Sequence, residues 1–241
     1  MVDQTAEQQL EFYKKLMGED LGPVFRHCRQ RLLSLTIVWD QFETLFGNQE
    51  RVDLMNEAGG SLAFNIYWQF LEGVTLGITR LLDPAQQKKF RNLSLYRLVD
   101  LCPQDISEAV RVQLEAINSS SQNFRLLRDK VIAHSDIDHV TGVKQPLAYP
   151  SRHHITMLLA KILELLNTVD KHYGVPSGSL SPMGNRDAFV HLRYLHRGAI
   201  AKKEMLGGSP DDFLNNLKKY EKADFLKETD EERDRYRSTD A

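Results

Sequence analysis

The sequence predicts an all-α protein, folded as an antiparallel bundle of long helices with a peripheral helical extension at its C-terminal end. Apolar residues recur at intervals of three and four positions along most of the chain, which is the period of an amphipathic helix. Alternating strand patterns and turn dipeptides are rare. With 41% hydrophobic and 27% charged residues among 241, the composition is that of a globular protein with a sizeable core.

The charge balance and the cysteines narrow the function classes. A formal net charge of −2 means that any contact with nucleic acid requires a local basic patch. Cys28 and Cys102 lack metal-ligand spacing and are too few for a disulfide framework. No window holds the roughly 18 consecutive apolar residues of a membrane span, and the polar N-terminus argues against a signal peptide. We therefore expect a cytoplasmic protein, with no membrane partner and with neither a cofactor nor a metal.

The first part of the bundle is predicted as two long helices. After an N-terminal segment over residues 1–20, an apolar stripe predicts a helix over residues 21–46. Asn48 is a suitable N-cap for a second helix, which ends at Asp83-Pro84 because the residue before proline disfavours the α conformation. This helix would hold about 34 residues and span roughly 50 Å. Its four glycines predict either close helix–helix contact or a kink: Gly59, Gly60, Gly73 and Gly77.

The rest of the predicted bundle, which ends at residue 173, alternates between helices and loops. In order, its elements are a short helix over residues 95–101, a long helix from Pro103 to His134, a loop over residues 136–150 and a helix from Ser151 that stops at Gly174. The three serines at 119–121 are expected to loosen the middle of the long helix.

The C-terminal third differs from the bundle in composition. Residues 174–185 are rich in glycine, proline and serine and are predicted to be a linker. Residues 186–241 are predicted to be a polar helical extension with two helices, over about 186–205 and 209–235. The second helix has few apolar positions, which favours a peripheral arm or a helix that docks on a partner.

The stretch from Arg128 to His134 lies at the end of the long helix, just before a loop, with Arg125 and Lys130 nearby. Arginine is a permanent cation whose planar fork binds phosphate, and histidine can take or give a proton near neutral pH. Together they suit RNA cleavage by attack of a ribose 2′-hydroxyl on the adjacent phosphate. One group would move protons while the other stabilised the charge that develops on the phosphate.

Helical geometry constrains this pair. Six residues of an ideal helix advance about 9 Å and leave the two side chains roughly 120° apart, so the pair converges poorly within one straight helix. It would converge if the helix unwound near Ala133. It would also converge if two copies packed this face together, since an isologous interface repeats each residue. A catalytic role therefore favours a homodimer.

Structural roles for the same residues are the alternative. His134 could cap the helix at the negative end of its dipole, and Arg128 could be a surface or ion-pairing residue. Arg80 and Asp83 flank the end of the second helix. They could form an ion pair or cap that closes this helix, or lie beside a cleft.

Residues 128–136, which read RDKVIAHSD, resemble the signature of the HEPN superfamily. That signature is an arginine, a polar residue, a short variable gap and a histidine at the end of a helix. The preceding Leu126-Leu127 and the ending AHSD resemble the abortive-infection, AbiU2-like branch. Residues 39–47 (WDQFETLFG) and 78–84 (ITRLLDP) resemble the helical core of the same branch. The resemblance covers about residues 21–173.

The resemblance implies a helical bundle, dimerisation through the motif face and, often, metal-independent endoribonuclease activity in toxins or phage-defence effectors. Carried over by position, Arg128 and His134 are expected to be catalytic. The expected supporting residues are Asp129, Arg125, Lys130, Ser135 and Asp136. The expected partners are RNA, a second copy of the chain, and a cognate antitoxin or other partner protein where one exists.

Two alternatives to an enzyme stay open. Many members of the superfamily are inactive, so the chain could be a module that binds a partner protein, a nucleotide or RNA without cleavage; it could also be purely structural. Three basic clusters could help to hold RNA or form solvated surface: Arg26-His27-Arg29-Arg31, Lys88-Lys89-Arg91 and Lys218-Lys219-Lys222. Neither His153-His154 nor the pair His191 and His196 has the spacing of a helical metal site.

Overall fold

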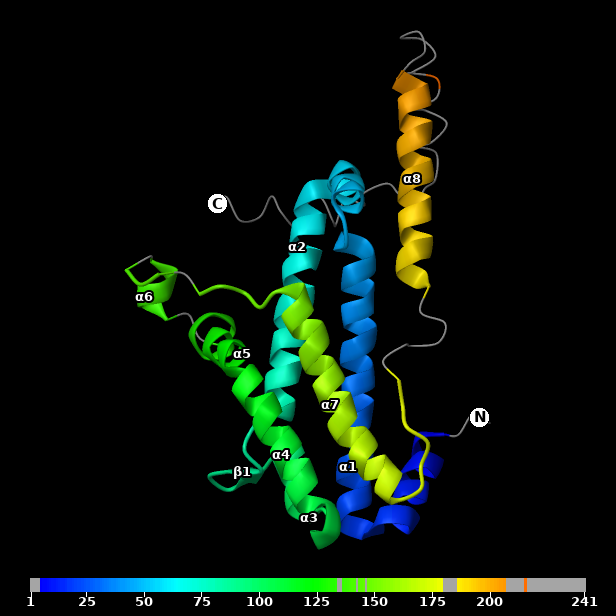
Figure 1. Ribbon diagram of the computed structural model, residues 1–241. Coiled ribbons are helices and arrows are strands. Elements are labelled where there is room, and N and C mark those ends of the chain that lie inside the picture. Colours follow the sequence, from blue (N-terminus) through cyan, green and yellow to red (C-terminus); the bar gives the residue numbers. More distant parts are fainter. Residues whose placement is uncertain are drawn as a thin grey trace, which may run out of the picture.

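The computed structural model describes residues 5–133, 136–141, 143–145, 147–179, 186–206 and 215. Within them, long helices dominate and form a bundle in which successive helices run in opposite directions (Figure 1). The long helices are α1 (Ala6–Phe46), α2 (Gln49–Leu81), α4 (Gln104–Ser120) and α7 (Arg152–His172). The predicted all-α bundle is therefore confirmed.

Helix α1 begins at Ala6, earlier than the predicted start at residue 21. Thr5 and Gln8 form a capping box, in which the hydroxyl of Thr5 accepts from the Gln8 N–H at 3.2 Å and the Gln8 amide oxygen accepts from the Thr5 N–H at 2.8 Å. The helix bends at Gly18, whose φ of 88° lies in the left-handed region that favours glycine. Half of residues 6–17 are hydrophobic, with Leu10, Tyr13 and Met17 at helical spacing, so the sequence does contain a signal for these first turns.

Helix α2 begins at the predicted cap, where the side chain of Asn48 accepts from the Arg51 N–H at 3.0 Å. Its glycines fulfil both predictions. Gly59 leaves the helical conformation and kinks α2. Gly77 lies against α1, where an added Cβ would overlap the Leu35 side chain, so glycine allows this close approach.

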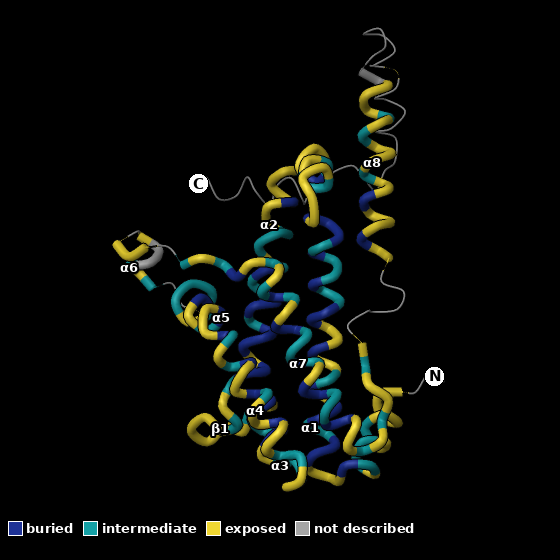
Figure 2. The backbone as a smooth tube through the Cα atoms, viewed as in Figure 1, coloured by how far each residue is buried: buried dark blue, intermediate teal, exposed yellow. Residues whose placement is uncertain are grey.

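The core lies between these helices, where Figure 2 shows the buried positions concentrated. Near the C-terminal end of α1, Trp39 and Phe42 stack at 4.9 Å between ring centroids, and Phe42 packs on Tyr67 of α2 at 5.1 Å. Trp39 also donates from Nε1 to the Thr156 hydroxyl of α7 at 2.9 Å. The largest fully buried side chains come from all parts of the bundle: Phe25, Phe42, Phe124, Leu32, Ile78, Leu81, Leu82, Leu95, Leu98, Ile117, Leu127 and Ile155.

Short elements connect the long helices. In order, they are a hairpin of β1 (Gln86–Gln87) and β2 (Phe90–Arg91), α3 (Leu95–Leu101), α5 (Gln122–Leu127), the π-helix η1 (Arg128–Ile132) and α6 (Ile137–Val140). The bounds of α3 are those predicted. A break at Ser121 divides the predicted long helix into α4 and α5, as the run of serines suggested. Neither the hairpin nor α6 was predicted.

Beyond α7, which starts at its predicted cap Ser151, residues 174–179 form neither helix nor strand. Asn167 holds Gly178 through two hydrogen bonds of 2.8 and 3.1 Å, so this segment is tied back onto α7. Helix α8 (Asp187–Leu206) then packs on α2 and α1 and extends past the end of the bundle (Figure 1). The second predicted C-terminal helix, residues 209–235, lies outside the described residues except for position 215.

Candidate functional site

Arg128 is the first residue of η1, a single π-helical turn that continues α5. The Ala133 N–H donates to the Arg128 carbonyl oxygen at 2.7 Å, a span of five residues instead of four. Such widened turns are rare and often occur at functional sites. Unwinding of the helix near Ala133 was one of the two ways in which Arg128 and His134 could converge. The structure shows the helix widened over Arg128–Ile132, directly before Ala133.

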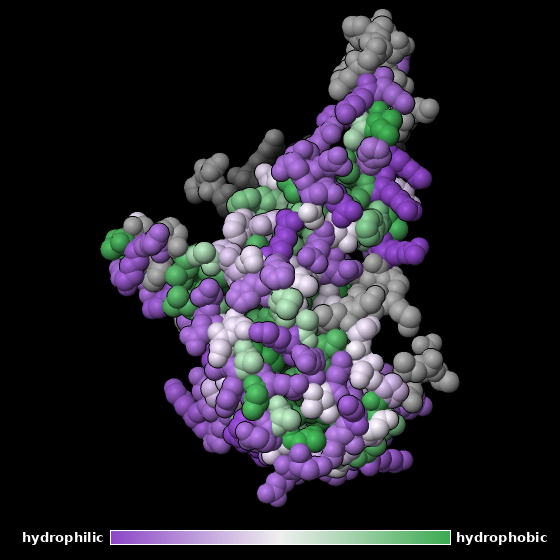
Figure 3. Space-filling model, viewed as in Figure 1, coloured by the Kyte–Doolittle hydropathy of each residue, from purple (hydrophilic) through white to green (hydrophobic). Residues whose placement is uncertain are grey.

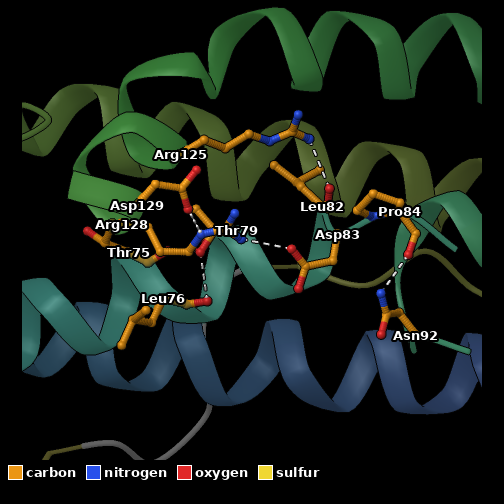
Figure 4. A network of polar contacts seen from close by, with 10 residues as sticks. All are labelled: Thr75, Leu76, Thr79, Leu82, Asp83, Pro84, Asn92, Arg125, Arg128 and Asp129. Atoms are coloured by element: carbon orange, nitrogen blue, oxygen red, sulfur yellow. Dashed lines mark hydrogen bonds and ion pairs between the residues drawn. The ribbon is translucent and has the colours of Figure 1, made fainter. Parts of the chain in front are cut away.

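The guanidinium of Arg128 lies between two carboxylates (Figure 4). Nη1 donates to Asp83 Oδ1 at 2.8 Å, and Nε donates to Asp129 Oδ1 at 2.7 Å. Of its five N–H groups, the other three have no partner among the described residues. Those groups are available to an oxyanion, which a guanidinium binds through parallel hydrogen bonds.

The surroundings keep Arg128 charged. Its side chain is 24% exposed. Partial burial would lower the pKa of Arg128, but the hydrogen bonds and negative charges of Asp129 and Asp83 outweigh that effect and raise this pKa above its ordinary value. The site therefore contains a permanent, oriented cation.

Asp83 owes its place to the end of α2. The helix stops at Leu81, and Pro84 prevents its continuation. A carboxylate near a helix C-terminus is unfavourable beside the negative end of the dipole, and the ion pair with Arg128 offsets that cost. Asp83 therefore forms its ion pair with Arg128, while the Arg80 side chain is exposed; a place beside a cleft stays a prediction for both residues.

Arg125, a predicted supporting residue, binds the same helix end. Its Nη2 donates to the Leu82 carbonyl oxygen at 2.9 Å and so caps α2 from α5 (Figure 4). Two neighbouring contacts, from Arg125 and from Arg128, therefore fasten α5 and η1 to the C-terminal end of α2.

Lys130 and Asp136 are held together by two contacts. Lys130 Nζ lies 2.8 Å from Asp136 Oδ2, and the Asp136 N–H donates to the Lys130 carbonyl oxygen at 3.0 Å. The chain between them contains His134 and Ser135, which lie outside the described residues. The pairing of Arg128 with His134 therefore stays a prediction. Of the predicted supporting residues, Asp129 and Lys130 lie within the stretch from Arg128 to His134, and Arg125 and Asp136 flank it.

Apolar side chains are exposed around the same turn. Leu126 is 45% exposed, Ile137 is 72% exposed and Val143 is 77% exposed. Helix α6 contacts η1 and projects from the bundle (Figure 1), and Figure 3 shows hydrophobic surface on this projection. We refer to residues 136–145 as the motif arm, of which 136–141 and 143–145 are described.

Among the described residues, no group of three or more histidine, cysteine, aspartate or glutamate residues could hold a metal ion. In the same part of the chain, every helix is too short or too polar to cross a membrane.

Comparisons with known proteins extend this picture. Neither a search of curated proteins nor a search of solved structures found a match. A scan of protein families did: the family HEPN_AbiU2, described as AbiU2, matches residues 18–192. This match includes α2, α5 and η1, which carry the site. Because it spans well over half of the 241 residues, the chain belongs to the AbiU2 family of the HEPN superfamily.

Proposed function

We propose that the protein is a metal-independent endoribonuclease that acts in the cytoplasm as a toxin or phage-defence effector. The observation that carries this proposal is Arg128 itself. The motif arginine sits on a widened helical turn, is charged and partly buried, and is oriented by Asp83 and Asp129 with N–H groups left for an anion. An RNA phosphate is the ligand that suits such a group.

The proposed step is transesterification within RNA. The ribose 2′-oxygen attacks the adjacent phosphorus, and the bond from phosphorus to the 5′-oxygen of the next nucleotide breaks. His134 removes the 2′-hydroxyl proton or donates one to the leaving 5′-oxygen, and Arg128 stabilises the charge that develops on the phosphate. The products are a 2′,3′-cyclic phosphate and a 5′-hydroxyl.

We further propose that the active form is a homodimer joined near the motif arm. The exposed Leu126, Ile137 and Val143 provide apolar surface beside η1, and burying such surface drives association. A two-fold interface there would bring Arg128 and His134 of both copies to one cleft.

The test is RNA cleavage in excess EDTA by wild type and by Arg128→Ala and His134→Ala. Matched controls are Arg111→Ala on α4 and His191→Ala on α8, both exposed positions. We expect the controls to cleave like wild type and each motif variant to lose about 100-fold or more in rate. A wild-type protein without activity, or motif variants that cleave as well as the controls, would refute the proposal.

One observation favours a second candidate, a non-catalytic module that binds RNA, a nucleotide or a partner protein. The two carboxylates already compensate the charge of Arg128, as they would in a purely structural ion pair. This candidate predicts that wild type binds its ligand yet yields no cleavage product, so the same assay separates the two.

A further inference from the structure

The hairpin between α2 and α3 exposes an unusual group of side chains. Lys88, Lys89, Phe90 and Arg91 are all exposed, and Phe90 is 63% exposed. Lys89 Nζ lies 5.5 Å from the centroid of the Phe90 ring. Basic residues next to an exposed aromatic ring are the combination with which proteins bind single-stranded nucleic acid: the cations contact phosphates and the ring stacks on a base.

This hairpin is firmly attached. The Asn92 side chain donates from Nδ2 to the Pro84 carbonyl oxygen at 2.8 Å (Figure 4), and the Asn92 N–H donates to the Ala85 carbonyl oxygen at 2.9 Å. These contacts close the base of the hairpin just after α2, so the tip keeps a defined position relative to the site.

A pocket of about 460 Å³ lies between the hairpin and the site. Its lining residues are Leu82, Pro84, Ala85, Gln86, Tyr96, Asp100 and Arg125. Tyr96 and Pro84 supply apolar surface for a flat ring. Asp100 disfavours a phosphate but can accept a hydrogen bond from the amino group of a nucleobase.

Two residues that line the pocket are near neighbours, in the chain, of Asp83 and Arg128. Leu82 lines the pocket and directly precedes Asp83, the partner of Arg128. Arg125 lines the pocket and lies one helical turn before Arg128. A strand bound over the hairpin and pocket would therefore present its next phosphate near Arg128.

The other basic clusters are less suited to this role. In the first, Arg26 is buried and Arg29 forms an ion pair with the buried Asp170 of α7, so two of its cations serve the bundle. The cluster at Lys218, Lys219 and Lys222 lies outside the described residues. Of the three basic clusters named above, the hairpin cluster alone combines exposed cations, an exposed ring and an adjacent pocket within the described part of the chain.

From this arrangement we propose that the hairpin, Gln86–Arg91, and the adjacent pocket form a subsite for single-stranded RNA. One base occupies the pocket beside Tyr96, another stacks on Phe90, and Lys88, Lys89 and Arg91 contact the phosphates. The inference deepens the proposed ribonuclease function and rests on it for the choice of RNA as ligand.

The experiment measures binding apart from cleavage. The full-length His134→Ala chain is titrated into a short fluorescein-labelled oligocytidylate RNA, and anisotropy is followed. In this background, Phe90→Ala and the double variant Lys88→Glu/Lys89→Glu are compared with matched controls on α8, Phe189→Ala and Lys202→Glu/Lys203→Glu. All these side chains are exposed, and α8 lies at the opposite end of the molecule from the hairpin (Figure 1).

We expect Phe90→Ala to weaken binding by about fivefold or more, the loss of one base stack. The double lysine variant should reduce the slope of log K against log salt concentration by about 1.4, because two phosphate contacts are lost. The α8 controls should bind like the parent chain.

Three outcomes would overturn the inference: no affinity of the parent chain for the RNA, hairpin variants that bind as tightly as the parent, or equal losses in the hairpin and α8 variants. Failure of the proposed cleavage can be distinguished from failure of the proposed subsite. A chain that needs the hairpin to bind RNA but never cleaves it supports the subsite and contradicts the proposed catalysis.

Discussion

Arg128 is oriented by contacts that lie on two elements. Asp129 belongs to its own turn, whereas Asp83 reaches it from the end of α2. The raised pKa of Arg128 means that its charge and any stability linked to it persist below its ordinary pKa and disappear only in strong alkali. Any pH dependence of cleavage near neutrality must therefore come from another group, which we expect to be His134.

Replacing Asp83 tests whether this orientation matters. We expect Asp83→Asn to lower the cleavage rate by about tenfold or more, because Arg128 loses one of its two anchors. The free energy of unfolding should change by less than about 1 kcal/mol, since partly exposed ion pairs contribute little. RNA cleavage and urea unfolding are measured beside Asp53→Asn, an exposed carboxylate on α2. Unchanged cleavage in Asp83→Asn would show that the contact has no functional role.

The two thiols predict how stability responds to alkali. Burial raises the pKa of Cys28 to about 12 and that of Cys102 to about 11, from 9.0. A raised folded-state pKa gives stability that is complete below pH 9 and lost between pH 9 and the folded pKa, because the unfolded chain ionises first. We expect Cys28 alone to remove roughly 2 kcal/mol from the free energy of unfolding by about pH 10.5. Urea unfolding from pH 7.5 upward measures this, and a Cys28→Ala variant should show a flatter profile; equal profiles would contradict it.

At the scale of elements, the sequence predicts helix boundaries best where they depend on a few neighbouring residues. The caps Asn48 and Ser151 start α2 and α7 as predicted, because a cap needs only its own side chain and the next few N–H groups. The helix over residues 6–17 was missed although Leu10, Tyr13 and Met17 recur at helical spacing, because Gly18 separates this segment from the apolar stripe that begins at residue 21. The π-helical turn at Arg128 was missed as well. A single backbone hydrogen bond that spans five residues instead of four leaves the helical pattern of apolar residues nearly unchanged, so the sequence does not reveal it.

The glycines of α2 allow a matched test of helix packing. Gly77→Ala places a Cβ against the buried Leu35, whereas an added Cβ at the exposed Gly73 meets nothing within 4 Å. We expect Gly77→Ala to lower the free energy of unfolding by about 1–2 kcal/mol through overpacking. Gly73→Ala should raise it by up to about 1 kcal/mol through helix propensity. Thermal or urea unfolding decides; the same sign for both variants would refute close packing at Gly77.

At the scale of the whole molecule, the fold assembles a site that no local pattern reveals. Asp83 and Arg128 are 45 residues apart in the chain, and they meet because α5 and η1 pack on the C-terminal end of α2. The motif itself could be identified from the sequence. Its carboxylate partner on another helix could not, because one sequence does not show which helix ends lie together.

The proposed dimer predicts a specific effect of charge on the motif arm. Ile137→Asp and Val143→Asp should shift the protein from dimer to monomer and reduce cleavage in parallel, because a buried unpaired carboxylate opposes association. Light scattering after size-exclusion chromatography measures the mass. Leu62→Asp, at a 65% exposed position on α2, is the matched control and should leave a dimer. A wild-type monomer that cleaves RNA would contradict the shared cleft.

Identification of the fragment ends produced from a defined RNA in EDTA tests the central claim most directly. Mass spectrometry of the 5′ fragment should show a 2′,3′-cyclic phosphate, and the 3′ fragment should begin with a 5′-hydroxyl. Both should be absent with Arg128→Ala and His134→Ala. A 3′-hydroxyl paired with a 5′-phosphate, or the same fragments from the two variants, would contradict cleavage by 2′-hydroxyl attack at this site.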